Sequence, residues 1–351
     1  MVAIEVGQIV QDFTIIMVIA SVMALISYKL KQPMVIGYII AGMIIGPYTP
    51  PFSLLINLDI LNLFAEIGII LLLFIVGMEF PIEKLRSIGR RALVIALSEA
   101  IGTFVSGIVI AQQFLHYSLY NSLFLGLAIS VTSTVIVMRI LEELDMIKEE
   151  ASQLILGVAV IEDIVVISML AILQSVSSTG HLSIIELGLS IGTVLAFIAG
   201  VIIAESKVHS VTRVIVTPIR DMFAAIFFVS VGALMDIRLL VIFIVLALVL
   251  IVISIAAKFL TVFLSSRTQG ISLRTSIRTA FGLSSSGGEL AQVVAKGGVD
   301  VGVSSSFILP MVGSMTIITT FITPYMVKIG WKIADALDIS DNNRSNNNKK
   351  T

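Results

Sequence analysis

The sequence contains no cysteine, only three histidines and few charged residues, and each shortage excludes a class of protein. Without cysteine there is no disulfide framework, no thiolate metal site and no catalytic thiol. His116, His181 and His209 all fall in expected loops, so a membrane-buried Ser/His dyad has no base. Asp163 is the one aspartate at the centre of an apolar span, which also removes an aspartyl dyad. An enzyme such as an intramembrane protease is therefore not expected.

Apolar residues are what the chain has in excess. Of its 351 residues 57% are apolar and 13% are charged, and the mean hydropathy is +1.08, far outside the usage of soluble proteins. Because about 20 residues cross a ~30 Å hydrocarbon core, the sequence predicts eleven membrane spans. They cover residues 8–28, 33–47, 59–79, 91–115, 120–141, 151–176, 183–204, 220–237, 239–264, 273–296 and 302–328. We predict an all-α polytopic membrane protein whose partner is the lipid bilayer, with no nucleic-acid partner.

Basic residues lie mainly on one side of these spans. With an outer N-terminus, 19 of the 22 lysines and arginines fall in inner loops, Arg238 and Lys296 fall outside, and Lys258 lies within a span. This asymmetry predicts a multi-pass protein of the cell membrane with its N-terminus outside and its C-terminus in the cytoplasm. After Trp331 the chain becomes polar and of low complexity, so residues 333–351 are expected to form a disordered cytoplasmic tail.

The span 151–176 carries two adjacent carboxylates, Glu162 and Asp163, at its middle. By translocon scales one such charge costs ~2.5 to 3.5 kcal/mol at a helix centre, so carboxylates are retained there where they face water, a cation or a partner. The alternative is a structural role, in which a neutral buried carboxyl group joins helices. We interpret the pair as the centre of a functional site.

Two other spans contain runs that weaken a helix. These runs are Ser130, Thr132, Ser133 and Thr134 in one span, and Ser284, Ser285, Ser286, Gly287 and Gly288 in the other. Broken membrane helices are tolerated only where they line a cavity. Thr132 precedes Asp163 by 31 residues, as Ser285 precedes Thr316, and the two helix pairs have opposite topology. This predicts inverted repeats with two crossing broken helices and an ion site at the midplane. Coincidence in a chain rich in serine, threonine and glycine is the alternative.

Seven runs of the sequence resemble, in order, segments of the monovalent cation/proton antiporter superfamily, in its Kef-type and NapA-type branch. They are PMVIGYIIAGMIIGP, AEIGIILLLFIVGMEF, GLAISVTSTVIVMRIL, GVAVIEDIVVISMLAIL, AFIAGVIIAES, FAAIFFVSVGALMD and SSSGGELAQVV. Any one run would be a weak signal, but together they cover about residues 20–330. The chain differs from the family in having about two helices fewer between the carboxylate span and AFIAGVIIAES.

The resemblance implies a sodium/proton antiporter fold over residues 1–330 and a homodimer of two-domain protomers. It implies a moving core of roughly 59–176 and 239–328, and a dimerisation scaffold of roughly 8–47 and 183–237. The function that it implies is exchange of a monovalent cation, Na⁺ favoured over K⁺, for protons by alternating access, without a cofactor. A sodium-coupled organic-anion symporter and a channel or non-transporting sensor are the alternatives.

The resemblance also assigns roles to residues. Asp163 matches the aspartate that carries the cation and the proton in turn, and the two exclude one another there. Glu162 stands where related antiporters have aspartate, asparagine or glutamine. We expect Thr132 and Ser133 to add oxygen ligands, which hard cations prefer. Lys258 matches the core lysine of electrogenic members and is expected to pair with Glu162, the alternative being a lysine that snorkels to the inner interface.

Three further glutamates and one serine within the predicted spans are also considered as possible residues of the ion site. Glu66 and Ser285 are possible secondary ion-site residues, Glu66 at the mouth of a cavity. For Glu99 and Glu289 we favour structural roles, in which they satisfy backbone groups or helix ends.

Overall fold

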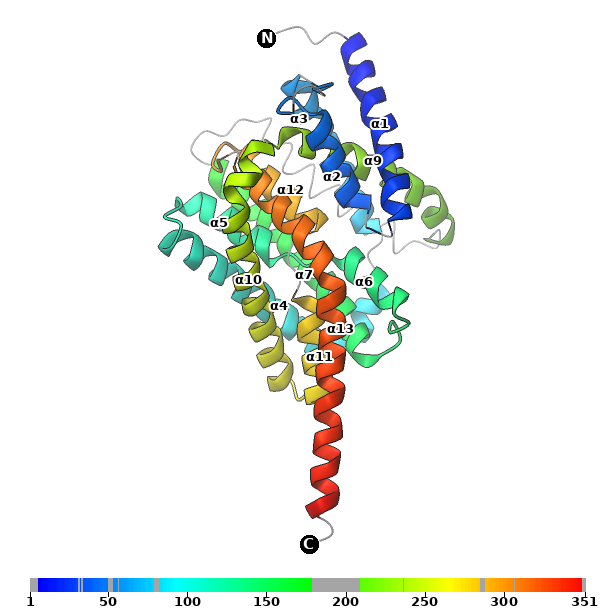
Figure 1. The fold of residues 1–351 in the computed structure, drawn as a ribbon, viewed down its shortest axis with the longest axis vertical. Coiled ribbons are helices and arrows are strands. Elements are labelled where there is room, and N and C mark those ends of the chain that lie inside the picture. Colours follow the sequence, from blue (N-terminus) through cyan, green and yellow to red (C-terminus); the bar gives the residue numbers. More distant parts are fainter. Residues whose placement is uncertain are drawn as a thin grey trace. The chain divides into compact units, whose positions relative to one another are not determined.

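The computed structural model describes residues 6–30, 32, 34–49, 53–55, 57–78, 82–178, 209–235, 237–284, 288–305 and 307–348 (Figure 1). These residues form helices and loops, with no strand among them, so the all-α prediction is confirmed. The chain divides into two compact units. The first comprises Met1–Ile82, Leu170–Ala247 and Gln292–Ser314, and the second comprises Glu83–Met169, Leu248–Ala291 and Met315–Thr351.

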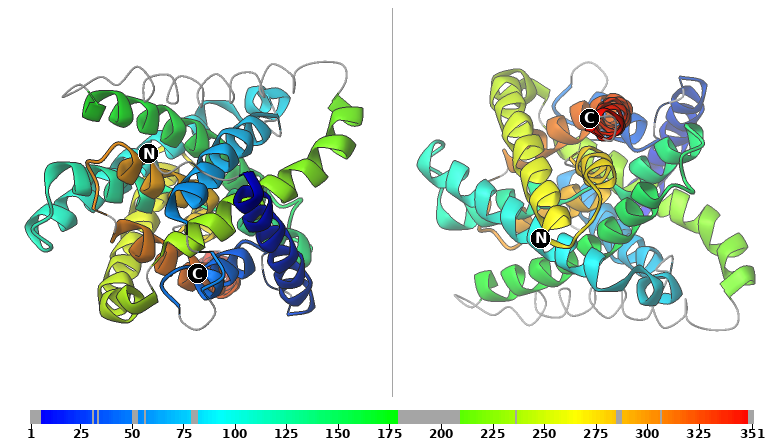
Figure 2. Two further views of the ribbon diagram at one scale, coloured as in Figure 1. Left: turned by 90° about the horizontal axis from the view of Figure 1, so that it is seen from above. Right: turned by 90° about the horizontal axis from the view of Figure 1, so that it is seen from below.

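The first unit is built around α9. It contains α1 (Val6–Lys29), α2 (Met34–Ile45), α3 (Leu58–Met78) and α9 (His209–Leu234). Helices α1, α2 and α3 all pack on α9, and α1 also packs on α2 (Figure 2). A Cβ atom on Gly42 would overlap the backbone of Val229, and one on Gly232 would overlap the backbone of Ile39. Glycine therefore lets α2 and α9 approach closely, as small residues do between membrane helices.

The second unit takes α4 (Ile82–Gln113), α5 (Leu119–Ser130), α6 (Thr134–Glu143) and α11 (Leu273–Leu283). Four helices contribute residues to both units: α7 (Glu150–Ser178), α10 (Ile237–Thr268), α12 (Glu289–Asp300) and α13 (Ile308–Asn348). Ser118 and Ser272 begin α5 and α11, because their hydroxyl groups accept the N–H groups of Asn121 at 3.3 Å and Thr275 at 3.1 Å. The apolar core of this unit includes Ile95, Val137, Ile155, Val262 and Leu283.

Both helices that the sequence predicts to be broken are interrupted. Residues 131–133 between α5 and α6 are not helical, and Val131 has an extended backbone with φ −69° and ψ 133°. On the other helix α11 ends at Leu283, and Gly288, just before α12, has a φ of 119°. The breaks meet in the second unit, where the Thr132 hydroxyl donates to the Leu283 carbonyl at 3.4 Å. A Cβ atom on Gly288 would lie 2.7 Å from Cβ of Ser133. The two broken helices therefore cross as predicted.

The predicted spans that fall within the described ranges are mainly helical, apart from the two breaks and the residues before Ile308. Among those residues, five helices are long and apolar enough to cross a membrane: Gly7–Lys29, Gly89–Gln113, Glu150–Ser177, Ile244–Thr268 and Ile308–Leu337. Met34–Ile45, Leu119–Ser130 and Met222–Leu234 are shorter apolar helices. The span predicted at 183–204, and the place before it where the chain is shorter than the family, lie outside the described residues.

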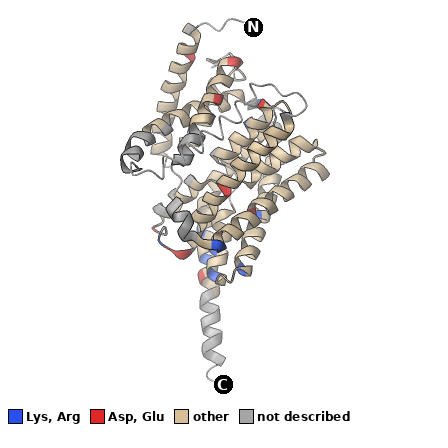
Figure 3. Cartoon of the chain, turned by 180° about the vertical axis from the view of Figure 1, so that it is seen from behind, with Lys and Arg blue, Asp and Glu red and all other residues tan. Residues whose placement is uncertain are grey.

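One detail differs from the predictions. Residues 333–351 were expected to be disordered, but α13 continues as a helix through Asn348. Extending an existing helix adds one hydrogen bond per residue without a new nucleus, so polar composition alone does not end it. Lys296, the last residue of the predicted span 273–296, is buried on α12 and pairs with Asp300, and its predicted position on the outer side stays a prediction. Apart from Lys258, the basic residues of the second unit that Figure 3 colours blue gather at one end, where α10 ends and α11 begins, and the assignment of this end to the cytoplasm stays a prediction.

Candidate ion-binding site

The two adjacent carboxylates of α7 contact the start of α6. Glu162 is fully buried, and its Oε1 atom accepts the backbone N–H of Thr132 at 2.5 Å. Asp163 is half-buried, and its Oδ2 atom accepts the hydroxyl group of Thr134 at 2.9 Å. Thr134 is the first residue of α6, where free N–H groups carry partial positive charge, so both carboxylates are stabilised there. Helix α7 thus holds the beginning of the second half of the broken helix.

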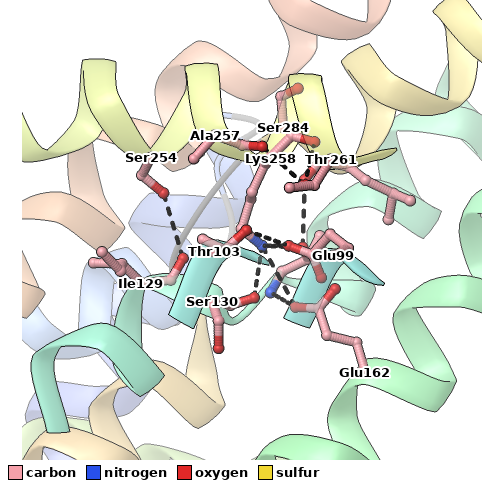
Figure 4. A network of polar contacts seen from close by, with 12 residues as sticks. Glu99, Thr103, Ile129, Ser130, Glu162, Ser254, Ala257, Lys258, Thr261 and Ser284 are labelled. Atoms are coloured by element: carbon pink, nitrogen blue, oxygen red, sulfur yellow. Dashed lines mark hydrogen bonds and ion pairs between the residues drawn. The ribbon is translucent and has the colours of Figure 1, made fainter. Parts of the chain in front are cut away.

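Lys258 of α10 places its ammonium group in the same cluster (Figure 4). Its Nζ atom donates to the carbonyl of Ser130 at 2.7 Å and to the hydroxyl of Thr132 at 2.5 Å. It also lies 3.0 Å from Oε1 of Glu99 and 3.5 Å from Oε1 of Glu162, and all three charged side chains are fully buried. Ser130 ends α5, where free carbonyl groups carry partial negative charge. The ammonium group therefore caps one half-helix while it faces two carboxylates.

The sequence did not predict the contact between Glu99 and Lys258. The predicted contact between Lys258 and Glu162 is present, but Glu99 of α4 lies nearer to the ammonium group. The hydroxyl of Thr103, one turn along α4, donates to the same Oε1 atom of Glu99 at 3.2 Å. The sequence indicates a role for Glu99 only because a carboxylate within an apolar span is energetically costly and is retained where it has a function. It does not indicate which residue Glu99 contacts.

The other predicted site residues lie as follows. Thr132 and Ser133 form the break beside the cluster, whereas the hydroxyl group that binds Asp163 belongs to their neighbour Thr134. The run of serine and threonine residues in the sequence indicated that this segment belongs to the site. It did not indicate which of these hydroxyl groups contacts α7. Glu66 is half-buried on α3 and belongs to the first unit. Ser285 lies outside the described residues, and so does the side chain of Glu289.

The cluster has the chemistry of a site for a small cation. Three carboxyl groups, those of Glu99, Glu162 and Asp163, lie in this part of the second unit with one ammonium group, that of Lys258. Within the described ranges, the Oε2 atoms of Glu99 and Glu162 have no hydrogen-bond partner. The three carboxyl groups do not converge on one point, because the described ranges contain no group of three or more histidine or acidic side chains placed to hold a metal ion. Carboxylate and hydroxyl oxygens of this kind can hold either an alkali cation or a proton.

Crossing broken helices around buried charges define a polytopic membrane transporter. The family model described as "Sodium/hydrogen exchanger, transmembrane" matches residues 16–197 and 192–332. The chain therefore belongs to the sodium/hydrogen exchanger family, and the resemblance read from the sequence is confirmed.

Individual relatives agree with this assignment. The chain is similar to YbaL of Escherichia coli (strain K12), with 27% identity over 342 residues, which are 80% of this chain and 61% of YbaL. It is 27% identical over 360 residues to the Na(+)/H(+)-K(+) antiporter GerN of Bacillus cereus, covering 86% of this chain and 91% of GerN. Its fold matches the sodium proton antiporter MjNhaP1 of Methanocaldococcus jannaschii with a TM-score of 0.71 and 14% identity, over 94% of this chain and 100% of MjNhaP1.

Proposed function

We propose that the protein exchanges a monovalent cation for protons across the membrane by alternating access, with Asp163 as the site that the two ions share. Na⁺ is the favoured cation and K⁺ the second. The observation that carries the proposal is the position of Asp163, half-buried on α7 and bonded to the first residue of α6 beside the break. Membership of the sodium/hydrogen exchanger family supports the activity, and similarity to GerN, an Na(+)/H(+)-K(+) antiporter, supports both cations.

Exchange follows from competition at one carboxylate. An alkali cation stabilises the charged form of Asp163, whereas a proton neutralises it, so the two do not bind together. An empty, charged site buried among apolar helices would carry an uncompensated desolvation cost. The site therefore crosses loaded with one ion or the other. Glu162 and the hydroxyl groups of Thr132, Ser133 and Thr134 add negative charge and oxygen ligands around it.

The experiment is transport by purified protein in proteoliposomes. A pH gradient is imposed, and its dissipation by Na⁺, K⁺ or Li⁺ is recorded with and without a membrane potential. We expect Na⁺ to dissipate the gradient and Asp163→Asn to abolish the effect while expression and assembly stay normal. Full exchange by Asp163→Asn would remove the carrier role, and no exchange by the unmodified protein with any alkali cation would remove the proposed function.

The remaining features of the proposal rest on the family resemblance. They are a homodimer, a core of roughly 59–176 and 239–328, a scaffold of roughly 8–47 and 183–237, and the absence of a resident cofactor. Two further features rest on the sequence itself: an outer N-terminus in the cell membrane, from the distribution of basic residues, and the absence of enzymatic activity, from the lack of a catalytic dyad. Cross-linking in membranes tests the dimer. Labelling of single cysteines is well suited to test the orientation, because the natural sequence contains no cysteine that would react.

A further inference from the structure

Lys258 has two carboxylate neighbours, and the structure distinguishes them. Its ammonium nitrogen lies 3.0 Å from Glu99 and 3.5 Å from Glu162. Glu162 has a second donor of its own, the N–H of Thr132, on the oxygen that faces the lysine. In Figure 4 the Lys258 side chain reaches down from α10 to the side of Glu99. Glu99 is thus the carboxylate nearer to the ammonium group of Lys258. Glu162 divides its contacts between this ammonium group and the backbone N–H of Thr132 at the start of α6.

Helix packing fixes the contact between Glu99 and Lys258. Gly102 of α4 and Thr261 of α10 each follow one member of the pair by three residues, about one helical turn. A Cβ atom on Gly102 would overlap the methyl group of Thr261, so α4 and α10 are close at this level. The Thr103 hydroxyl then orients the Glu99 carboxylate by donating to the oxygen that faces Lys258.

We infer that Glu99 is a positioning residue of the transport site, which balances the charge of Lys258 and holds its ammonium group against the end of α5. The inference rests on the proposed function, because it concerns how the site remains open to a cation. With Glu99 in place, the charge of Lys258 is matched without Glu162 or Asp163. The carboxyl oxygens of Glu162 and Asp163 on α7 are then left as ligands for the transported ion.

Removal of Glu99 should turn Lys258 into a competitor of the cation. The ammonium group would have Glu162 as its remaining carboxylate neighbour, and its unmatched positive charge would repel a cation bound beside the carboxylates of α7. The cation affinity should therefore fall, whereas the maximum rate should change little. A glutamate that only stabilised the fold would lower the amount of active protein, and so the maximum rate, without changing the KM.

The test measures the KM for Na⁺ and the maximum rate in proteoliposomes. For Glu99→Gln we expect a KM at least about tenfold higher with the maximum rate kept, and for Glu99→Asp a KM within about threefold of the unmodified protein. The double substitution Glu99→Gln with Lys258→Gln removes a neutral pair, so it should return the KM to within about threefold. Glu150→Gln, an exposed glutamate of the same unit, is the matched control and should change neither value.

An unchanged KM in Glu99→Gln, or a double variant no better than Glu99→Gln, would overturn the inference. A second readout does not need transport. The Tm of detergent-solubilised single and double variants gives a coupling for each carboxylate with Lys258, because breaking a buried pair destabilises more than removing both partners. We expect the coupling of Glu99 to exceed that of Glu162, and the reverse order would overturn the inference. If the unmodified protein exchanges no alkali cation, the proposed function fails while this readout still decides the pairing.

Discussion

The hydroxyl group of Thr134 donates a 2.9 Å hydrogen bond to Asp163, across 29 positions of the chain. The bond joins the first residue of a half-helix to the carboxylate proposed to carry the ion. Thr134→Val keeps the shape of the side chain and removes this oxygen. Because a hydrogen bond to a charged group contributes about 1.5–3 kcal/mol, we expect the KM for Na⁺ to rise roughly tenfold or more. Thr134→Ser is the control and should stay within about threefold, and an unchanged KM in the valine variant would assign the hydroxyl to structure alone.

Glu162→Gln separates the two contacts of that residue. The amide oxygen of glutamine can still accept the N–H of Thr132, so the start of α6 should be preserved and the Tm nearly unchanged. The loss of one negative charge beside Asp163 should raise the KM for Na⁺ and alter the dependence of transport on membrane potential. Transport kinetics at several imposed voltages check this. If neither quantity changes, Glu162 is a helix cap and not part of the ion site.

Competition between the two ions predicts a specific pH dependence. Protons occupy the carboxylate more as the pH falls, so less of it is free for Na⁺. The apparent KM for Na⁺ should rise on acidification, approaching tenfold per pH unit once the protonated form dominates, while the rate at saturating Na⁺ is kept. Initial rates at a series of Na⁺ concentrations and pH values give both quantities. A falling maximum rate at constant KM would mean that the proton acts elsewhere.

At the basic end of the second unit, Trp331 joins α13 to its neighbours. Its indole N–H donates to Glu149 at 3.0 Å, and its ring lies 5.2 Å below the guanidinium group of the buried Arg278. Trp331→Phe removes a hydrogen bond to a charged group and should cost about 1.5–3 kcal/mol, and Trp331→Ala should cost about 3–5 kcal/mol because it also leaves the volume of the indole ring empty. Thermal unfolding in detergent measures both. Tyr325→Ala, an exposed aromatic residue on the same helix, should have little effect.

The sequence was a good guide to the helices and to their breaks, because both depend on local composition. Apolar runs of sufficient length predicted the spans, and the hydroxyl and glycine runs predicted where two of them are interrupted. The partners within the site were harder to predict. Glu99 precedes Asp163 by 64 positions, and nothing in the periodicity of α4 says that this helix packs against α10 at Gly102. The hydrogen bond between Thr134 and Asp163 was not predicted, because the chain at the break follows neither helical nor strand periodicity, whereas Thr132 and Ser133 stay predicted ligands.

The fit of Gly288 against Ser133 limits how the site can move. The space between these two residues is too small for a methyl group. The non-helical segment at Ser133 therefore cannot slide along the segment at Gly288 unless the two segments first move apart. Rearrangement of a single half-helix would therefore open a void at the crossing. Passage of an ion is consequently more compatible with displacement of the crossed segments as a single rigid body than with a rearrangement that travels from helix to helix.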